Sequence, residues 1–158
     1  MTDDATVATH SNPASPKANF VLHADLAPHG MPGHWEQLWT TQVSDGRFEV
    51  CCIPFFTYGV ALGDVVSAGP RAGQSWVMEG VISRSGHRTL RLAVESQAAA
   101  RELHEALHEA VAQTGLAHEW HGSGYVAIDL PPETRAEEIL ALFAGHIRVG
   151  TLSAEVDD

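Results

Sequence analysis

The stretch RTLRLAVESQAAARELHEALHEAVAQT, residues 88–114, decides the fold because its pattern of apolar residues changes part-way along. Residues 88–94 are typical of a strand, in which neighbouring side chains point to opposite faces. From Glu95 the period becomes that of an amphipathic helix over residues 98–114, and Gly115 follows in the position that favours a left-handed cap. The apolar residues at helical spacing are Leu103, Leu107, Ala110 and Val111. A strand followed by such a helix predicts that the second half mixes both element types.

The rest of the second half continues the alternation. Residues 124–130 are predicted to form a strand that stops at Pro131-Pro132, and residues 134–143 a second helix. A last strand is predicted over residues 148–156. The resulting order, β-α-β-α-β, predicts a ferredoxin-like half over residues 88–156.

The first half is predicted to be rich in strands. Residues 1–18 lack hydrophobic periodicity and are expected to be a flexible tail. Asp45-Gly46, between two β-rich runs, predicts a hairpin. We therefore expect an α+β protein with one globular domain over residues 19–156. In it a small, bent antiparallel sheet over residues 19–94 packs on the ferredoxin-like half.

Composition and charge exclude several classes of protein. The chain has 158 residues, with 20 acidic and 9 basic side chains and a net charge of −11. No apolar run approaches the roughly 20 residues of a membrane-spanning helix. The negative charge argues against nucleic acid as a partner, because that binding depends on Lys and Arg. The acidic residues near the start do not fit an export signal, and neighbouring Cys51 and Cys52 suit two reduced thiols, so we expect a cytoplasmic protein.

Five short motifs occur in order along the chain. They are Glu36-Gln-Leu-Trp39, Pro54-Phe-Phe56, Gly63-Asp-Val-Val66, Ser85-Gly-His-Arg-Thr-Leu-Arg91 and Val126-Ala-Ile-Asp-Leu-Pro-Pro132. With these motifs the chain resembles the bacterial family known as domain of unknown function 4265, over about residues 19–156. The resemblance implies no reaction. It draws attention to the aromatic connection, the Gly-Asp turn and the Ser-Gly-His hairpin.

The hairpin around Ser85 and Gly86 is the candidate binding site, because it concentrates positive charge. Three of the eight arginines lie there, at Arg84, Arg88 and Arg91. Guanidinium groups suit carboxylate or phosphate, and His87 is a candidate general acid or base. Two interpretations stay open: the arginines bind an anion or a partner, or they pair internally with carboxylates such as Glu79, Asp64 or Asp129.

A second candidate is a metal site on the helix. His104, Glu105 and His108 satisfy the H-E-x-x-H pattern of zinc hydrolases. A third ligand would have to come from His118, Glu119 or His121. The apolar stripe passes beside the two histidines, and this favours a solvated helix flank over a metal site.

These features favour a small acidic binding protein without catalysis of its own and without a cofactor. Its partner would be a protein or a small anionic ligand, and neutralising or regulating a basic protein would suit the charge of −11. The alternatives are a small enzyme that holds an anionic substrate at the Ser85–Arg91 hairpin, and a zinc hydrolase that uses His104, Glu105 and His108.

Overall fold

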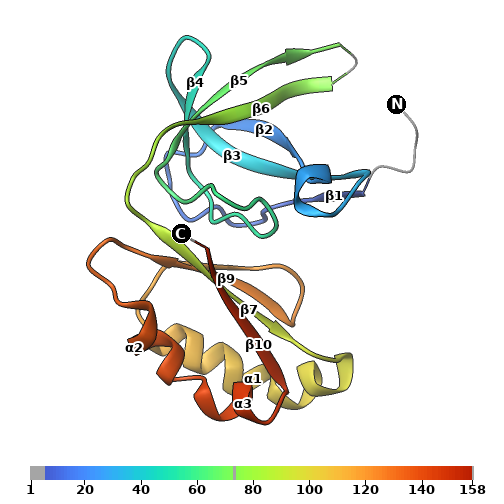
Figure 1. Ribbon diagram of the computed structural model, residues 1–158, viewed down its shortest axis with the longest axis vertical. Coiled ribbons are helices and arrows are strands. Elements are labelled where there is room, and N and C mark those ends of the chain that lie inside the picture. Colours follow the sequence, from blue (N-terminus) through green and yellow to red (C-terminus); the bar gives the residue numbers. More distant parts are fainter. Residues whose placement is uncertain (1–5, 73, 158) are drawn as a thin grey trace.

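The computed structural model describes residues 6–72 and 74–157, which form two stacked halves (Figure 1). The upper half consists of six strands and one short 3₁₀ helix. They are β1 (Thr6–Ala8), β2 (Phe20–Asp25), η1 (Ala27–His29), β3 (His34–Ser44), β4 (Arg47–Val50), β5 (Val65–Arg71) and β6 (Gln74–Ser83). The lower half contains four strands and three helices. They are β7 (Arg88–Val94), α1 (Gln97–Gln113), β8 (His118–Trp120), β9 (Tyr125–Leu130), α2 (Ala136–Ala141), α3 (Ala144–Arg148) and β10 (Leu152–Asp157).

The upper sheet closes on itself. Its order is β1-β3-β2-β6-β5-β4, and β3 also pairs with β4, so strands β2 to β6 form a ring of hydrogen-bonded neighbours. The Asp45-Gly46 turn joins β3 and β4 as an antiparallel hairpin, as predicted, with Gly46 at φ +68°. Nine buried residues fill this half: Leu22, Ala24, Leu38, Phe48, Val50, Cys52, Val60, Val66 and Ala68.

The lower sheet has two different faces. Its strands run antiparallel in the order β10-β7-β9-β8. One face packs against the helices through a core that is centred on Leu90, Leu92, Val126 and Ile128. Side chains alternate between the two faces along a strand. Arg91 lies between Leu90 and Leu92 in sequence, so its side chain lies on the other face, toward the upper half.

The fold-class prediction is wrong in both halves. In the lower half the order is β-α-β-β-α-α-β rather than the predicted ferredoxin-like β-α-β-α-β, because residues 118–120 form the additional strand β8 and a further helix, α3, lies between α2 and the last strand. In the upper half the sheet is mixed, not antiparallel, since β1 pairs with β3 and β2 with β6 in parallel. Strands, rather than helices, make up most of the regular structure in the described residues.

The N-terminal segment also differs from the prediction of a flexible tail over residues 1–18. Residues 1–5 lie outside the described part of the chain. Residues 6–8 form β1 on the edge of β3, and His10 is only 4% exposed. The segment is held in place because the His10 imidazole is hydrogen-bonded to Glu36 in the upper half and to Glu119 in the lower half, and both are distant in sequence. Within residues 6–72 and 74–157, no helix is long and apolar enough to cross a membrane.

Candidate functional site

A long loop of the upper half lies against the lower sheet. The central loop, residues 51–64, leaves β4, crosses the upper face of the lower sheet and returns to β5. Its side chains Ile53 and Phe55 pack with Ala127 of β9 in a small core of their own. A loop buried in this way must find partners for its backbone groups, since unpaired buried amides are strongly unfavourable.

Glu36 of β3 accepts hydrogen bonds from three consecutive amides of the central loop. Its Oε1 accepts from the amides of Phe56 and Thr57, both at 3.0 Å, and from the Thr57 hydroxyl at 2.7 Å. Its Oε2 accepts from the amide of Phe55 at 2.7 Å. One fully buried carboxylate therefore determines the path of three consecutive loop residues.

His10 connects Glu36 to a second buried carboxylate. Its Nε2 lies 2.7 Å from Glu36 Oε2, and its Nδ1 lies 2.7 Å from Oε1 of Glu119 in β8. The imidazole also stacks on the Phe55 ring, with 4.2 Å between ring centroids and 3° between planes. Glu119 Oε2 in turn accepts from the amide of Ile53 at 2.6 Å. The carboxylates come from different halves, so this cluster joins them.

Charge explains the protonation of the cluster. Burial lowers the pKa of His10, but its hydrogen bonds to Cys52, Glu119 and Glu36 outweigh burial and raise the pKa to about 12. Burial raises the pKa of Glu36, and the hydrogen bond and charge of His10 reverse this, so that its pKa lies below the ordinary value. Burial raises the pKa of the Cys52 thiol. At neutral pH the cluster therefore holds an imidazolium, with Glu36 ionised beside it and a neutral thiol.

Arg91 of β7 satisfies the carbonyl groups of the same loop. It is 2% exposed, its Nε and Nη2 donate to the carbonyl of Pro54 at 3.2 and 3.0 Å, and Nη2 also donates to the carbonyl of Thr57 at 3.2 Å. Its Nη1 lies 3.3 Å from Oδ2 of Asp157 in β10. The predicted binding residue Arg91 thus has internal partners, and its carboxylate partner is Asp157 rather than one of the carboxylates named in the sequence analysis.

The predicted residues Ser85 and Gly86 form the connection between the halves. The Ser85 amide and hydroxyl donate to Oδ1 of Asp64 at 2.8 and 3.1 Å, and the hydroxyl also donates to the carbonyl of Leu62 at 2.7 Å. Gly63 lies against this serine at φ +87°, and a Cβ at position 63 would be 3.0 Å from the Ser85 Cβ. The Gly-Asp turn and the Ser-Gly-His hairpin therefore form one contact.

The other hairpin residues point in separate directions. His87 Nδ1 lies 2.8 Å from Oδ1 of Asp129 in β9, whose pKa is raised by burial, although the hydrogen bond from His87 opposes this. Exposed Arg84 donates to the carbonyl of Gly59 at 3.1 Å. Arg88 donates to the carbonyl of Thr134. Arg84 and Arg91 both contact the pair of Gly59 and Asp157, since the Gly59 amide donates to Asp157 Oδ2 at 2.8 Å, whereas Arg88 contacts Thr134 instead. Binding of an anion by these arginines stays a prediction.

The H-E-x-x-H residues lie on α1, on the far side of the lower sheet. The His104 and His108 rings are 4.3 Å apart, and His108 stacks on Trp120 with 3.6 Å between centroids. Glu105 is exposed. Over residues 6–72 and 74–157, no group of three or more His, Cys, Asp or Glu side chains is placed to hold a metal ion.

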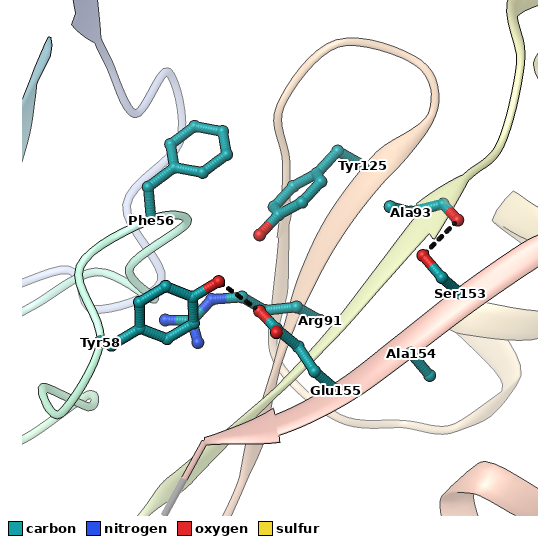
Figure 2. Close-up of a pocket in the computed structure, with 8 residues that line it drawn as sticks. All are labelled: Phe56, Tyr58, Arg91, Ala93, Tyr125, Ser153, Ala154 and Glu155. Atoms are coloured by element: carbon teal, nitrogen blue, oxygen red, sulfur yellow. Dashed lines mark hydrogen bonds between the residues drawn. The ribbon is translucent and has the colours of Figure 1, made fainter. Parts of the chain in front are cut away.

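A cavity of about 310 Å³ opens beside the central loop, between the two halves (Figure 2). Phe56 and Tyr125 line it side by side and contact each other, with 5.1 Å between their ring centroids. Tyr58 lies over the Arg91 guanidinium, 4.9 Å from it, and donates to Glu155 Oε1 at 2.8 Å (Figure 2). The remaining lining residues are Ala93, Ser153 and Ala154.

The cavity is lined by aromatic rings, by the buried guanidinium of Arg91 and by the carboxylate of Glu155. Burial and the hydrogen bond to Glu155 both raise the pKa of Tyr58, and burial raises the pKa of Tyr125. Both phenols therefore stay neutral at physiological pH. The charge of Arg91 is balanced by Asp157, and Glu155 adds an exposed carboxylate at the rim. Aromatic faces beside a carboxylate attract a cationic group.

Most residues of the buried cluster and of this cavity were not predicted as site residues. One signal existed in the sequence: Glu36 falls in phase with Leu38 and Thr40 along β3, and all three are fully buried. A carboxylate in the apolar phase of a strand indicates a buried partner. His10 and Glu119 carry no comparable local signal, because their contacts join residues 109 positions apart.

Comparison with known proteins agrees with the motifs. The family described as Domain of unknown function (DUF4265) matches residues 36–154. The chain belongs to this family. A crystal structure titled as a hypothetical protein from Neisseria gonorrhoeae is similar in fold to this DUF4265 protein, with a TM-score of 0.62 and 17% sequence identity over 98% of this chain and 94% of that one. A comparison with curated proteins gave no match.

In this DUF4265 protein the five motifs lie around the junction of the halves. The first supplies Glu36, the second forms the part of the central loop that Glu36 binds, and the third supplies Asp64. The fourth supplies Ser85 and Arg91, while the fifth belongs to β9. The motifs therefore coincide with the interface that shapes the cavity.

Proposed function

We propose that this protein acts by association with a basic protein partner, and that the cavity between the halves receives a lysine or arginine side chain of that partner. The observation that carries the proposal is the aromatic cavity formed by Phe56, Tyr58 and Tyr125, with Glu155 at its rim. A cation that lies on aromatic faces and pairs with a carboxylate gains from both contacts. Neutralising or regulating the basic partner is the role that follows.

The charge of the chain supports the same partner. A net charge of −11 attracts a basic protein over a distance of about one Debye length, ~10 Å at 0.1 M salt. Such attraction raises the rate of association and weakens as salt is added. The cavity adds a specific contact to this general attraction.

The alternative, an enzyme that holds an anionic substrate at the Ser85–Arg91 hairpin, has less support. Asp129 provides an orienting group for His87, as a general base requires. However, the Ser85 hydroxyl is engaged by Asp64 and Leu62, and Arg91 is engaged by the central loop. Within the described residues, His87 lines neither the cavity of Figure 2 nor the cavities beside α1 and α3.

A titration with a minimal ligand tests the proposal. The probe is N-acetyl-arginine amide, and its neutral isostere N-acetyl-citrulline amide is the reference. Chemical-shift changes are followed by NMR at low salt. We expect the arginine probe to bind with a millimolar Kd, because one side chain offers few contacts, and to shift the resonances of Tyr125 and Glu155. The citrulline probe should leave these resonances unchanged.

Two variants complete the test. Glu155→Gln removes the rim carboxylate and should weaken binding of the arginine probe severalfold. Glu102→Gln removes the same charge from the exposed surface of α1, across the sheet from the cavity, and should leave binding unchanged. Equal binding of the arginine and citrulline probes, or equal effects of the two variants, would refute the proposal.

A further inference from the structure

We infer that the partner binds as an extended segment, which adds a strand to the edge of the lower sheet at β10. This inference rests on the proposed function and specifies the shape of the partner. β10 is the last strand in the order β10-β7-β9-β8, and it pairs only with β7 among the described residues. An edge strand of this kind can pair with a strand from another chain.

The register of β10 shows which backbone groups point outward. The amide of Glu95 donates to the carbonyl of Thr151, and the amide of Val94 donates to the carbonyl of Gly124 on the opposite side, so the odd-numbered residues of β7 face β10. In an antiparallel ladder, hydrogen-bonded pairs alternate with pairs whose backbone groups point away from each other. The backbone groups of Leu152, Ala154 and Val156 therefore point to the outer edge, where an added strand would meet them.

Two cavities flank this edge, one on each face of the sheet. The aromatic cavity of Figure 2 lies on the upper face, and a second cavity of about 420 Å³ lies on the helix face. Ala154 lines both of them. The second cavity is mostly apolar, and its other lining residues are Leu140, Ala141, Ala144, Ile147 and Arg148.

The alternating side chains of an added strand would reach both of these cavities. Successive side chains of a strand point to opposite faces of the sheet. A cationic residue on the upper face would lie beside Glu155, while its apolar neighbours would lie toward Leu140 and Ile147 on the helix face. The segment that fits is therefore extended, with basic and apolar residues in alternation.

Charge favours this occupant over a second copy of the chain. β10 carries Glu155 and Asp157 and no basic residue, and each copy has a net charge of −11. Pairing of two β10 edges would bring these carboxylates close to one another, which is unfavourable for like charges on neighbouring strands. A basic segment would instead pair with them.

The test uses two substitutions at one position and a defined peptide. Ala154→Pro removes the outward amide hydrogen, and proline is tolerated where the amide faces away from the sheet. Ala154→Val is the matched control, since it adds similar bulk but keeps the amide. The probe is a fluorescent octapeptide of alternating arginine and valine, together with the same peptide N-methylated at alternate residues. Binding is measured by anisotropy at low salt, after thermal unfolding has compared the stability of the variants.

We expect Ala154→Pro and N-methylation each to weaken binding about tenfold, since each removes backbone hydrogen bonds, while Ala154→Val changes it little. The methylated peptide tests the inference on the unchanged protein should the proline variant fail to fold. Binding that needs Glu155 but is insensitive to both backbone changes would overturn the added strand and retain the cationic site. The absence of binding by either peptide would overturn both. A dimer in sedimentation that Ala154→Pro dissociates would show that a second copy covers the edge, and would also overturn the inference.

Discussion

The substitution Glu36→Gln tests whether one buried carboxylate organises the junction of the two halves. Glutamine keeps the shape of the side chain but replaces one oxygen by an amide nitrogen. If that nitrogen takes the place of Oε2, it faces the amide of Phe55 and the ring nitrogen of His10, both of which are donors in the native protein. If it takes the place of Oε1, it faces the donors of Phe56 and Thr57. Either rotamer leaves buried donors without an acceptor.

The size of the effect follows from burial. Glu36 is fully buried, and removal of one partner of a buried ion pair typically destabilises by about 3–5 kcal/mol. A native domain has a total stability of about 5–15 kcal/mol, so the variant should lose a large part of it. At about 2–4 °C per kcal/mol for a chain of this size, the Tm should fall by roughly 6–20 °C.

Urea unfolding followed by tryptophan fluorescence measures this loss. The control is Glu79→Gln, which makes the same change at an exposed position of β6. The control should stay within about 0.5 kcal/mol of the native protein, as most surface substitutions do. A loss below about 1 kcal/mol for Glu36→Gln, within the range of an exposed pair, would refute the reasoning.

Three further predictions concern the same junction. The pKa of His10 is raised to about 12 from the ordinary 6.5, so the stability it contributes is complete below pH 6.5 and is lost as the pH rises from there toward 12. We expect the free energy of unfolding to fall by about 1.4 kcal/mol per pH unit above pH 7, and a pH series of urea titrations should find this slope absent in His10→Gln. Arg91→Met should destabilise by about 3–5 kcal/mol, because Asp157 and two buried carbonyls lose their partner; a calorimetric Tm equal to that of the native protein would contradict this. Gly63→Ala should destabilise more than Gly59→Ala in urea titrations, since both positions have positive φ but only position 63 lies against Ser85; equal losses would show that the close contact is unimportant.

Local sequence patterns predicted many individual elements. The strand at residues 88–94 has the predicted bounds, and α1 differs from the predicted 98–114 by one residue at each end. These elements are encoded by residues within one or two turns of each other, so a single sequence contains the information. The predicted second helix over 134–143 is shorter, since α2 covers residues 136–141. The last strand begins at residue 152 rather than 148, since α3, which was not predicted, occupies residues 144–148.

The junction was not predictable in the same way. Polar residues are expected at the surface, so a prediction from the sequence does not place His10 and Glu119 in the interior. Their burial is favourable only because each has a partner far away in sequence, and no local pattern records that partner. The family motifs did indicate the region, because they include Glu36, the central loop and Arg91, but they did not say which of these residues contact one another.

The way the central loop is held has a consequence for dissecting the protein. Four of its amides donate to Glu36 in the upper half or to Glu119 in the lower half, and two of its carbonyls accept from Arg91. Separate expression of either half would leave charged groups without partners on an apolar surface. The connection between β6 and β7 is therefore no boundary at which the chain can be cut into autonomous pieces, and the halves should unfold in a single cooperative transition.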